Sequence, residues 1–359
     1  TADLDAMLRP VTDPYQRMRI VHKYVRDNMQ WNELDNIWAL NGVKAAWKDK
    51  KGTSGEINLI LINLLKDAGL NAHAILVSTS DNGAVNTGVA EVKQFNKVLA
   101  YVEIEDKVYV LDAIEKYTPD YLIPSEVMAS EGLLIANPES MQWGWKTLWD
   151  GSHSNKRTVQ FDAEVDDKGM MKGNAIVTDA DYARVEMMSE LKQSTDKTKK
   201  ELQTQQDLQI DTINIENADT DSLPLVRSFK FSVPTASSGD YHYFSVNWFA
   251  GLNKNPFIAD ERQTDVFFAT MKDYSIDCSV VLPDGYVMDD LPKNTKLIMP
   301  DTSIVFTRKT VFENGILSVV MNLQLRSAVF AAADYETFKE FYKKMFAMLN
   351  DKFVYKKKA

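Results

Sequence analysis

The spacing of apolar residues changes near residue 150, and this change constrains the fold more than any other feature of the sequence. Up to that point, apolar residues recur at helical spacing over 14–30 and 54–66. Strands are then predicted at 72–78, 98–103 and 108–112, the last two as a hairpin. Helices followed by antiparallel strands are typical of an α+β domain, which we assign to residues 1–150.

From residue 151 to 359 the pattern is one of short segments in which apolar and polar residues alternate. Nine such segments are predicted as strands, at 159–165, 171–177, 210–217, 226–233, 242–248, 264–268, 275–282, 303–311 and 316–325. Their spacing predicts a β-sandwich. A charged helical insertion is predicted at 181–208, and a closing helix at 334–350 with an apolar stripe from Tyr335 to Met348.

Charge and composition argue against several classes of function. The net charge is −10 at pH 7, and an acidic chain without a basic stripe is a poor partner for nucleic acid. The basic run Lys356–Lys358 is interpreted as a solvated tail. No apolar stretch of transmembrane length occurs, and neither metal-ligand spacing nor a phosphate or dinucleotide motif is found, so we expect no transmembrane segment and no cofactor. The single cysteine, Cys278, is expected to be a strand residue.

The segment Gly52–Glu56 has the features of a helix start, a position at which a nucleophilic side chain can be activated. Thr53 and Glu56 form a capping-box pattern, so a helix is predicted to begin at Ser54 and to end before Gly69. A cysteine at such a helix start would gain thiolate character from the helix dipole. A serine gains far less, and therefore needs a base within hydrogen-bond reach.

Four segments together resemble the transglutaminase-like superfamily, which has a papain-like fold. They are Gly52–Leu59, Leu64–Ala72, Phe95–Val98 and Val108–Ala113. The resemblance implies that Ser54 stands in place of the catalytic cysteine, Lys97 in place of the histidine, and Asp112 in place of the aspartate. The first domain is therefore expected to be a papain-like transglutaminase domain whose triad is degenerate at two of three positions.

The second domain resembles the β-rich domain that follows the transglutaminase-like domain in a group of large bacterial envelope proteins. The resemblance rests on Asn255–Phe257, Arg262, Leu282–Tyr286 and the closing helix. It implies a location in the periplasm or at the cell surface. It also implies a further β-rich domain before residue 1, which fits a chain that begins at Thr1 without a methionine.

Three hypotheses on function follow. The first is a non-catalytic binding or structural module whose cleft holds an extended peptide or a glycan. The second is a peptidase or amidase that uses Ser54 as nucleophile and Lys97 as base, although Asp112 would favour the charged lysine and could simply form a salt bridge with it. The third is a carbohydrate-binding module, since aromatic faces stack on sugars, although such clusters also fill domain interfaces. The aromatic residues in question are Trp143, Trp145, Trp149, Tyr241, Tyr243, Phe244 and Trp248.

Overall fold

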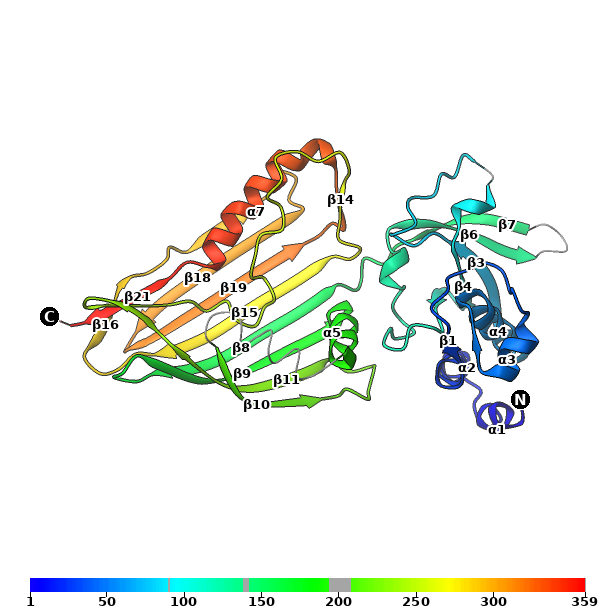
Figure 1. Ribbon diagram of the computed structural model, residues 1–359, viewed down its shortest axis with the longest axis horizontal. Helices are drawn as coiled ribbons and strands as arrows, with labels where there is room; N and C mark the ends of the chain where they lie inside the picture. The colour runs from blue at the N-terminus through cyan, green and yellow to red at the C-terminus, as the bar shows by residue number, and fades with distance from the viewer. Residues whose placement is uncertain (90, 138–141, 194–207, 359) are drawn as a thin grey trace. The chain divides into compact units, whose positions relative to one another are not determined.

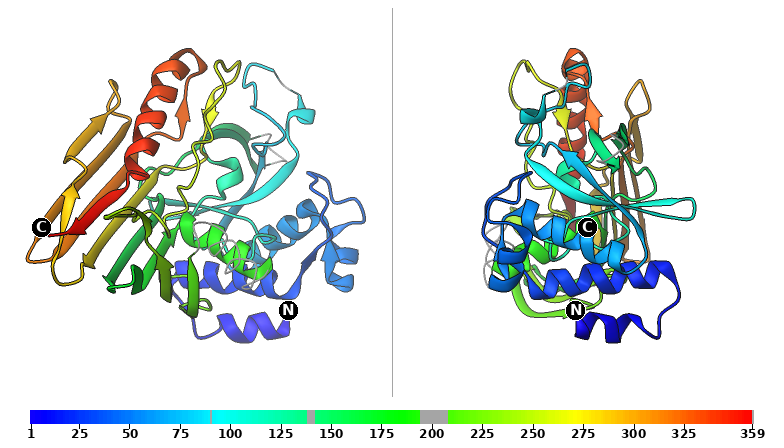
Figure 2. Two further views of the ribbon diagram at one scale, coloured as in Figure 1. Left: turned by 60° about the vertical axis from the view of Figure 1, so that its left-hand side comes forward. Right: turned by 90° about the vertical axis from the view of Figure 1, so that its right-hand side faces the viewer.

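The computed structural model describes residues 1–89, 91–137, 142–193 and 208–358. The chain divides into two compact units, Thr1–Ser152 and His153–Ala359, and each is treated by itself below (Figures 1 and 2). The α+β character expected from the sequence is confirmed, with the helices concentrated in unit 1 and most of the strands in unit 2. None of the helices in the described ranges has both the length and the apolar character that a membrane crossing requires.

Unit 1 begins with four helices. Their bounds are α1 Ala2–Leu8, α2 Pro14–Asn28, α3 Val43–Asp49 and α4 Ser54–Asp67. Helix α2 begins where Asp13 accepts a hydrogen bond from the Gln16 backbone N–H at 2.7 Å and Pro14 occupies the first turn. Helix α1 was not predicted from the sequence. The two-residue strands β1 (Gln30–Trp31) and β2 (Lys51–Gly52) pair in parallel just before α4.

The sheet of unit 1 has five antiparallel strands in the order β5-β4-β3-β6-β7. Their bounds are β3 Asn71–Val77, β4 Lys97–Ile104, β5 Lys107–Leu111, β6 Ser130–Asn137 and β7 Gln142–Leu148. The predicted hairpin is present and turns at Glu105, whose φ is +54°. Strands β6 and β7 were not predicted from the sequence, and β7 lies in the tryptophan-rich stretch.

Helix α4 lies against one face of this sheet and is buried along most of its length. Leu61 and Leu65 pack with Val21 of α2 and with Val102 of β4 in one core cluster. A smaller cluster forms on the other face, where Ile75 and Leu99 pack with Val127 of the short 3₁₀ helix η2 (Ser125–Val127) and with Leu134 of β6. A second short 3₁₀ helix, η1 (Val92–Gln94), precedes β4. The sheet is therefore covered on both faces, and α4 is held between α2 and the strands.

Unit 2 is built on one eight-stranded sheet in the order β10-β11-β9-β8-β15-β19-β18-β17. The bounds are β8 Asn155–Val165, β9 Met170–Asp181, β10 Gln209–Glu216, β11 Leu225–Pro234, β15 Lys272–Val281, β17 Thr295–Ile298, β18 Ile304–Glu313 and β19 Ile316–Leu325. All neighbours are antiparallel except β8 and β15, which pair in parallel and join the two halves.

One face of the large sheet is covered by a mixed layer. This layer contains helix α7, the four-stranded sheet β12-β13-β21-β16 and the strand pair β14-β20. Their bounds are β12 Ala236–Ser238, β13 Tyr241–Phe244, β14 Val266–Phe267, β16 Tyr286–Asp290, β20 Val329–Phe330, α7 Tyr335–Leu349 and β21 Phe353–Lys357. The β-rich prediction is confirmed, but a helix occupies part of the layer that a β-sandwich would fill with a second sheet.

The closing helix is confirmed as α7, a further expectation is confirmed for its described part, and two others need correction. The helical insertion is confirmed for α5 (Tyr182–Gln193), whereas its predicted continuation through 194–207 lies outside the described residues. The strand predicted at 242–248 ends at Phe244. The basic tail is not free, because Phe353 and Tyr355 are buried and place Lys356 and Lys357 in β21. The two aromatic residues at positions 353 and 355, spaced to share one face of a strand, were the overlooked signal.

Candidate functional site

The start of helix α4 is capped as the sequence predicts. Thr53 Oγ1 accepts from the Glu56 N–H at 3.2 Å, and Glu56 Oε2 accepts from the Thr53 N–H at 3.0 Å. The other Glu56 oxygen accepts from the Asn41 N–H at 2.6 Å, and the Ser54 N–H donates to the Leu34 carbonyl at 3.1 Å. These donors, which would serve an anion in an active site, are thus already used by the protein itself.

The Ser54 hydroxyl is fully buried beneath the segment around Asn36. Its exposed fraction is 0%, and its Oγ accepts a hydrogen bond from the Asn36 N–H at 3.0 Å. The next residue, Gly55, is so close to this segment that a Cβ would lie 2.5 Å from the Asn36 carbonyl oxygen. The serine that replaces the expected cysteine is therefore covered by backbone and closed to a substrate.

Lys97, the first residue of β4, lies at the centre of three carboxylates. Its side chain is 1% exposed, and its Nζ lies 2.9 Å from Asp112 Oδ2 and 2.5 Å from Glu126 Oε1. A third carboxylate, Asp35 Oδ1, lies 3.8 Å away. A buried ammonium needs such partners, since an unpaired charge in the interior is very costly.

The charges in this cluster shift one another's pKa. Burial alone would lower the pKa of Lys97, but Asp112, Glu126 and Asp35 together outweigh it and raise that pKa above its ordinary value. Burial raises the pKa of Glu126 to about 7, with Asp112 adding to the rise and Lys97 opposing it. The side chains of Glu126 and Asp35 are 31% and 30% exposed, so the cluster touches solvent at these two carboxylates, whereas Lys97 and Asp112 are buried.

Asn58 fixes the position of Asp112 from helix α4. Its Nδ2 donates to Asp112 Oδ1 at 2.9 Å and to the Val98 carbonyl at 2.9 Å, while its Oδ1 accepts from the Ala113 N–H at 2.8 Å. Asn58 lies one helical turn after Ser54, which places both on the same face. Asn58 is a polar residue among the apolar positions of this helix that face the core, and this was the signal that could have revealed its role.

The structure thus brings Lys97 and Asp112 into contact, as the salt-bridge alternative expected, and places Ser54 nearby through the segment Asp35–Asn36. No hydrogen bond between the Ser54 hydroxyl and the Lys97 amine occurs among the contacts of the described residues. Glu126 and Asp35 were not foreseen, because Glu126 belongs to η2 and Asp35 to a loop, and both are distant from Lys97 in sequence. Within the described ranges, no group of three side chains is arranged to hold a metal ion.

A small open pocket lies beside this cluster, with a volume of about 280 Å³. One wall is the segment Asp35–Trp38, and the other is formed by Val92, Lys93, Phe95 and Asn96. Trp38 is 60% exposed at this wall. Exposed tryptophan next to a pocket is typical of a contact site for another molecule.

The aromatic residues of the carbohydrate hypothesis do not gather on one surface. Phe244 and Trp248 belong to the buried core of unit 2. In unit 1, Trp145 packs against Phe95 with ring centroids 6.1 Å apart, and Trp143 is 63% exposed on β7. Only some of these rings are therefore available for stacking on a sugar.

Comparison with known proteins gives limited information. Residues 240–355 match the model of a family described as a domain of unknown function with a solved structure, DUF3858. None of the curated proteins matches the chain. The chain is similar to a crystal structure from Parabacteroides distasonis named "putative protease", with 10% sequence identity and a TM-score of 0.57. The similarity covers 99% of this chain and 54% of that one, so the chain spans about half of its length. At this identity the similarity concerns the fold.

Proposed function

We propose that the chain is a non-catalytic member of the transglutaminase-like superfamily that acts as a binding or structural module of the bacterial cell envelope. One observation carries this proposal: the lysine in the place of the expected catalytic histidine is held as a buried cation by Asp112 and Glu126. The antiparallel strands that carry Lys97 and Asp112, packed against helix α4, support the resemblance in fold.

An amine can act as a general base only in its deprotonated, neutral form, so the pKa of a lysine base must fall toward neutrality. The carboxylates around Lys97 raise its pKa instead, so its amine stays protonated at neutral pH. The nucleophile is also out of reach, because the Ser54 hydroxyl is covered by Asn36. Both requirements of a serine–lysine mechanism are therefore unmet.

A peptidase or amidase that uses Ser54 and Lys97 is the alternative, and the name of the similar solved structure keeps it worth testing. The test is labelling of the purified chain with a serine-directed fluorophosphonate, together with hydrolysis and transamidation of a peptide library. We expect no labelling and no turnover in the wild type. Labelling that disappears in both Ser54→Ala and Lys97→Met would overturn the proposal.

For the binding role, we propose that an extended peptide binds in the pocket between Asp35–Trp38 and Val92–Asn96. Peptides selected by display against the wild type should bind Trp38→Ser at least about tenfold more weakly, since a buried tryptophan contact is a typical hot spot. Leu40→Ser is the control, because Leu40 is similarly exposed on the same segment but does not line the pocket. Equal loss in both variants would refute the assignment of this pocket.

A further inference from the structure

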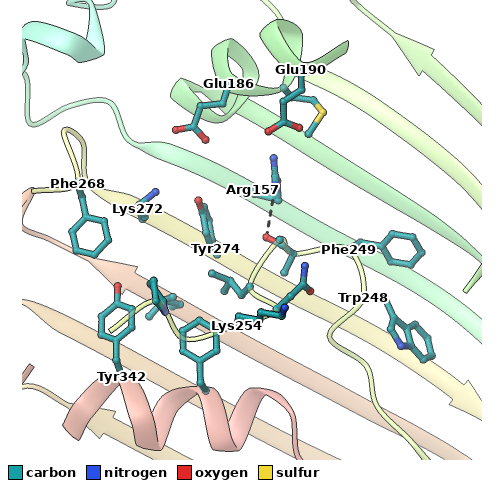
Figure 3. Close-up of a pocket in the computed structure, with 18 of the residues that line it drawn as sticks. Arg157, Glu186, Glu190, Trp248, Phe249, Lys254, Phe268, Lys272, Tyr274 and Tyr342 are labelled. Atoms are coloured by element: carbon teal, nitrogen blue, oxygen red, sulfur yellow. Dashed lines mark hydrogen bonds between the residues drawn. The ribbon is translucent and has the colours of Figure 1, made fainter. Parts of the chain in front are cut away.

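Unit 2 contains a cavity of about 430 Å³ on the covered face of its large sheet. Figure 3 shows Arg157 of β8 and Lys272 and Tyr274 of β15 along its base, with helix α5 on one side and helix α7 on the other. This volume is within the usual range of small-molecule pockets, about 300–1,000 Å³. No family description or comparison assigns a role to it.

Aromatic rings form the wall next to α7. Phe268 and Tyr342 stack with centroids 6.3 Å apart, and Phe257 meets the edge of Tyr342 at 4.7 Å (Figure 3). Tyr274 is held in place because its hydroxyl donates to Asn155 Oδ1 at 3.1 Å. The wall is therefore preformed, which reduces the entropy cost of binding an apolar body.

Lys272 is a partly buried cation between two rings. Its Nζ lies 5.6 Å from the Phe268 ring centroid and 5.7 Å from that of Tyr274. Among the residues that the structure describes, no carboxylate forms an ion pair with it. Burial lowers the pKa of Lys272, and Glu186 only partly opposes this effect, as expected for an ammonium that water solvates poorly and that a bound anion would stabilise.

Arg157 adds positive charge to the same base. Asp179 pairs with two guanidinium groups at once, at 2.6 Å from Arg157 Nε and 2.7 Å from Arg227 Nη2. One carboxylate therefore balances two cations. The acidic residues of the pocket, Glu186 and Glu190, belong to α5 and are solvent-exposed, so water screens their charges more than the deeper Lys272.

We propose that this cavity binds a small carboxylate with an apolar or aromatic body. The carboxylate pairs with the Lys272 ammonium, and the body packs against Phe268 and Tyr342. The cavity lies wholly within unit 2, so this assignment stands apart from the function proposed for the Lys97 cluster.

The test compares three probes of one shape: 3-phenylpropionate, 3-phenylpropan-1-ol and 3-phenylpropylamine. Binding to the full chain is measured by isothermal titration calorimetry, with saturation-transfer NMR for weak binding. We expect the carboxylate to bind with a Kd on the order of 1 mM or tighter, and the alcohol and amine at least about tenfold more weakly. An amine or alcohol that binds as tightly as the carboxylate would overturn the proposal.

The matched variants are Lys272→Met and Lys309→Met. Lys272→Met keeps most of the side-chain volume and should weaken binding of 3-phenylpropionate at least about tenfold, because it removes only the charge. Lys309 is solvent-exposed on β18 and does not line the cavity, so Lys309→Met should change the Kd less than about twofold. Thermal unfolding of each variant checks that it is folded. Unchanged binding in folded Lys272→Met, or equal loss in both variants, would refute the role of Lys272.

Discussion

Lys97 Nζ lies 2.9 Å from Asp112 Oδ2, and both side chains are almost fully buried. Lys97 begins β4, and Asp112 follows the end of β5. Because these two strands are paired, the hairpin brings its open ends together and the two side chains meet there. A histidine at position 97 could titrate near neutral pH, whereas a lysine in this ion pair cannot. In the function proposed above, the pair acts as a buried electrostatic contact.

Lys97→Met should destabilise the chain strongly, because it leaves Asp112 and Glu126 without their cation. Removing one partner of a buried ion pair costs about 3–5 kcal/mol. The measurement is the free energy of unfolding in urea, followed by circular dichroism. The double variant Lys97→Met/Asp112→Asn should recover part of this loss, since it removes the uncompensated charge as well.

The control for this prediction is Lys23→Met. Lys23 Nζ also lies 2.7 Å from a carboxylate, that of Asp27, but both side chains are mostly exposed. An exposed pair of this spacing in a helix contributes less than about 0.5 kcal/mol. Similar losses in Lys97→Met and Lys23→Met would contradict the structural role of the buried pair.

Glu126 should make stability fall as pH rises from about 4.5 to 7. Its pKa is raised to about 7 in the folded chain from an ordinary pKa of 4.5, so the folded state binds more protons than the unfolded state in this range. Unfolding then becomes easier with rising pH, by about 1–3 kcal/mol once partial exposure is allowed for.

Glu126→Gln should remove this decline, because glutamine does not titrate. Urea midpoints of the wild type and the variant are compared at several values between pH 4.5 and 7.5. Glu105→Gln, in the exposed turn of the hairpin, serves as the control and should follow the wild type. Parallel curves for the wild type and Glu126→Gln would show that the carboxyl titrates equally in both states.

Asn58→Ala should cost about 2–4 kcal/mol, because it leaves the buried Val98 carbonyl, the Ala113 N–H and Asp112 with fewer partners. Asn63→Ala in the same helix is the matched control, since Asn63 is exposed and should change stability by less than about 0.5 kcal/mol. The measurement is the free energy of unfolding of both variants in urea. Equal stability of the two variants would contradict the prediction.

Gly55→Ala should destabilise the chain by about 1–3 kcal/mol, because the added Cβ would press on the Asn36 carbonyl at 2.5 Å. At Gly144 in β7, a Cβ would meet nothing within 4 Å, so Gly144→Ala should be neutral or stabilising by up to about 1 kcal/mol. Thermal unfolding of both variants checks the difference. A neutral Gly55→Ala would mean that the segment over Ser54 gives way easily.

The sequence by itself determined the features that depend on neighbouring residues. Thr53 and Glu56 fix the start of α4, and Gly69, with φ of +80°, follows its end, because caps act within a few residues. Most strands of the large sheet could also be predicted, since their apolar residues alternate with polar ones and lie on the side that packs against the core. The prediction of a solvated tail was wrong, because Phe353–Lys357 pairs with β13 and β16, which are distant in sequence.

Only the tertiary structure decided what surrounds Lys97. Asp35 lies in a loop and Glu126 in η2, both far from residue 97 in the chain, and no spacing rule connects them to Lys97. The covering of Ser54 by Asn36 and the cavity around Lys272 have the same origin, because each is assembled from segments that meet only after folding. Local capping and periodicity are therefore written in neighbouring residues, whereas the charge state of a buried group depends on which distant carboxylates the fold brings to it.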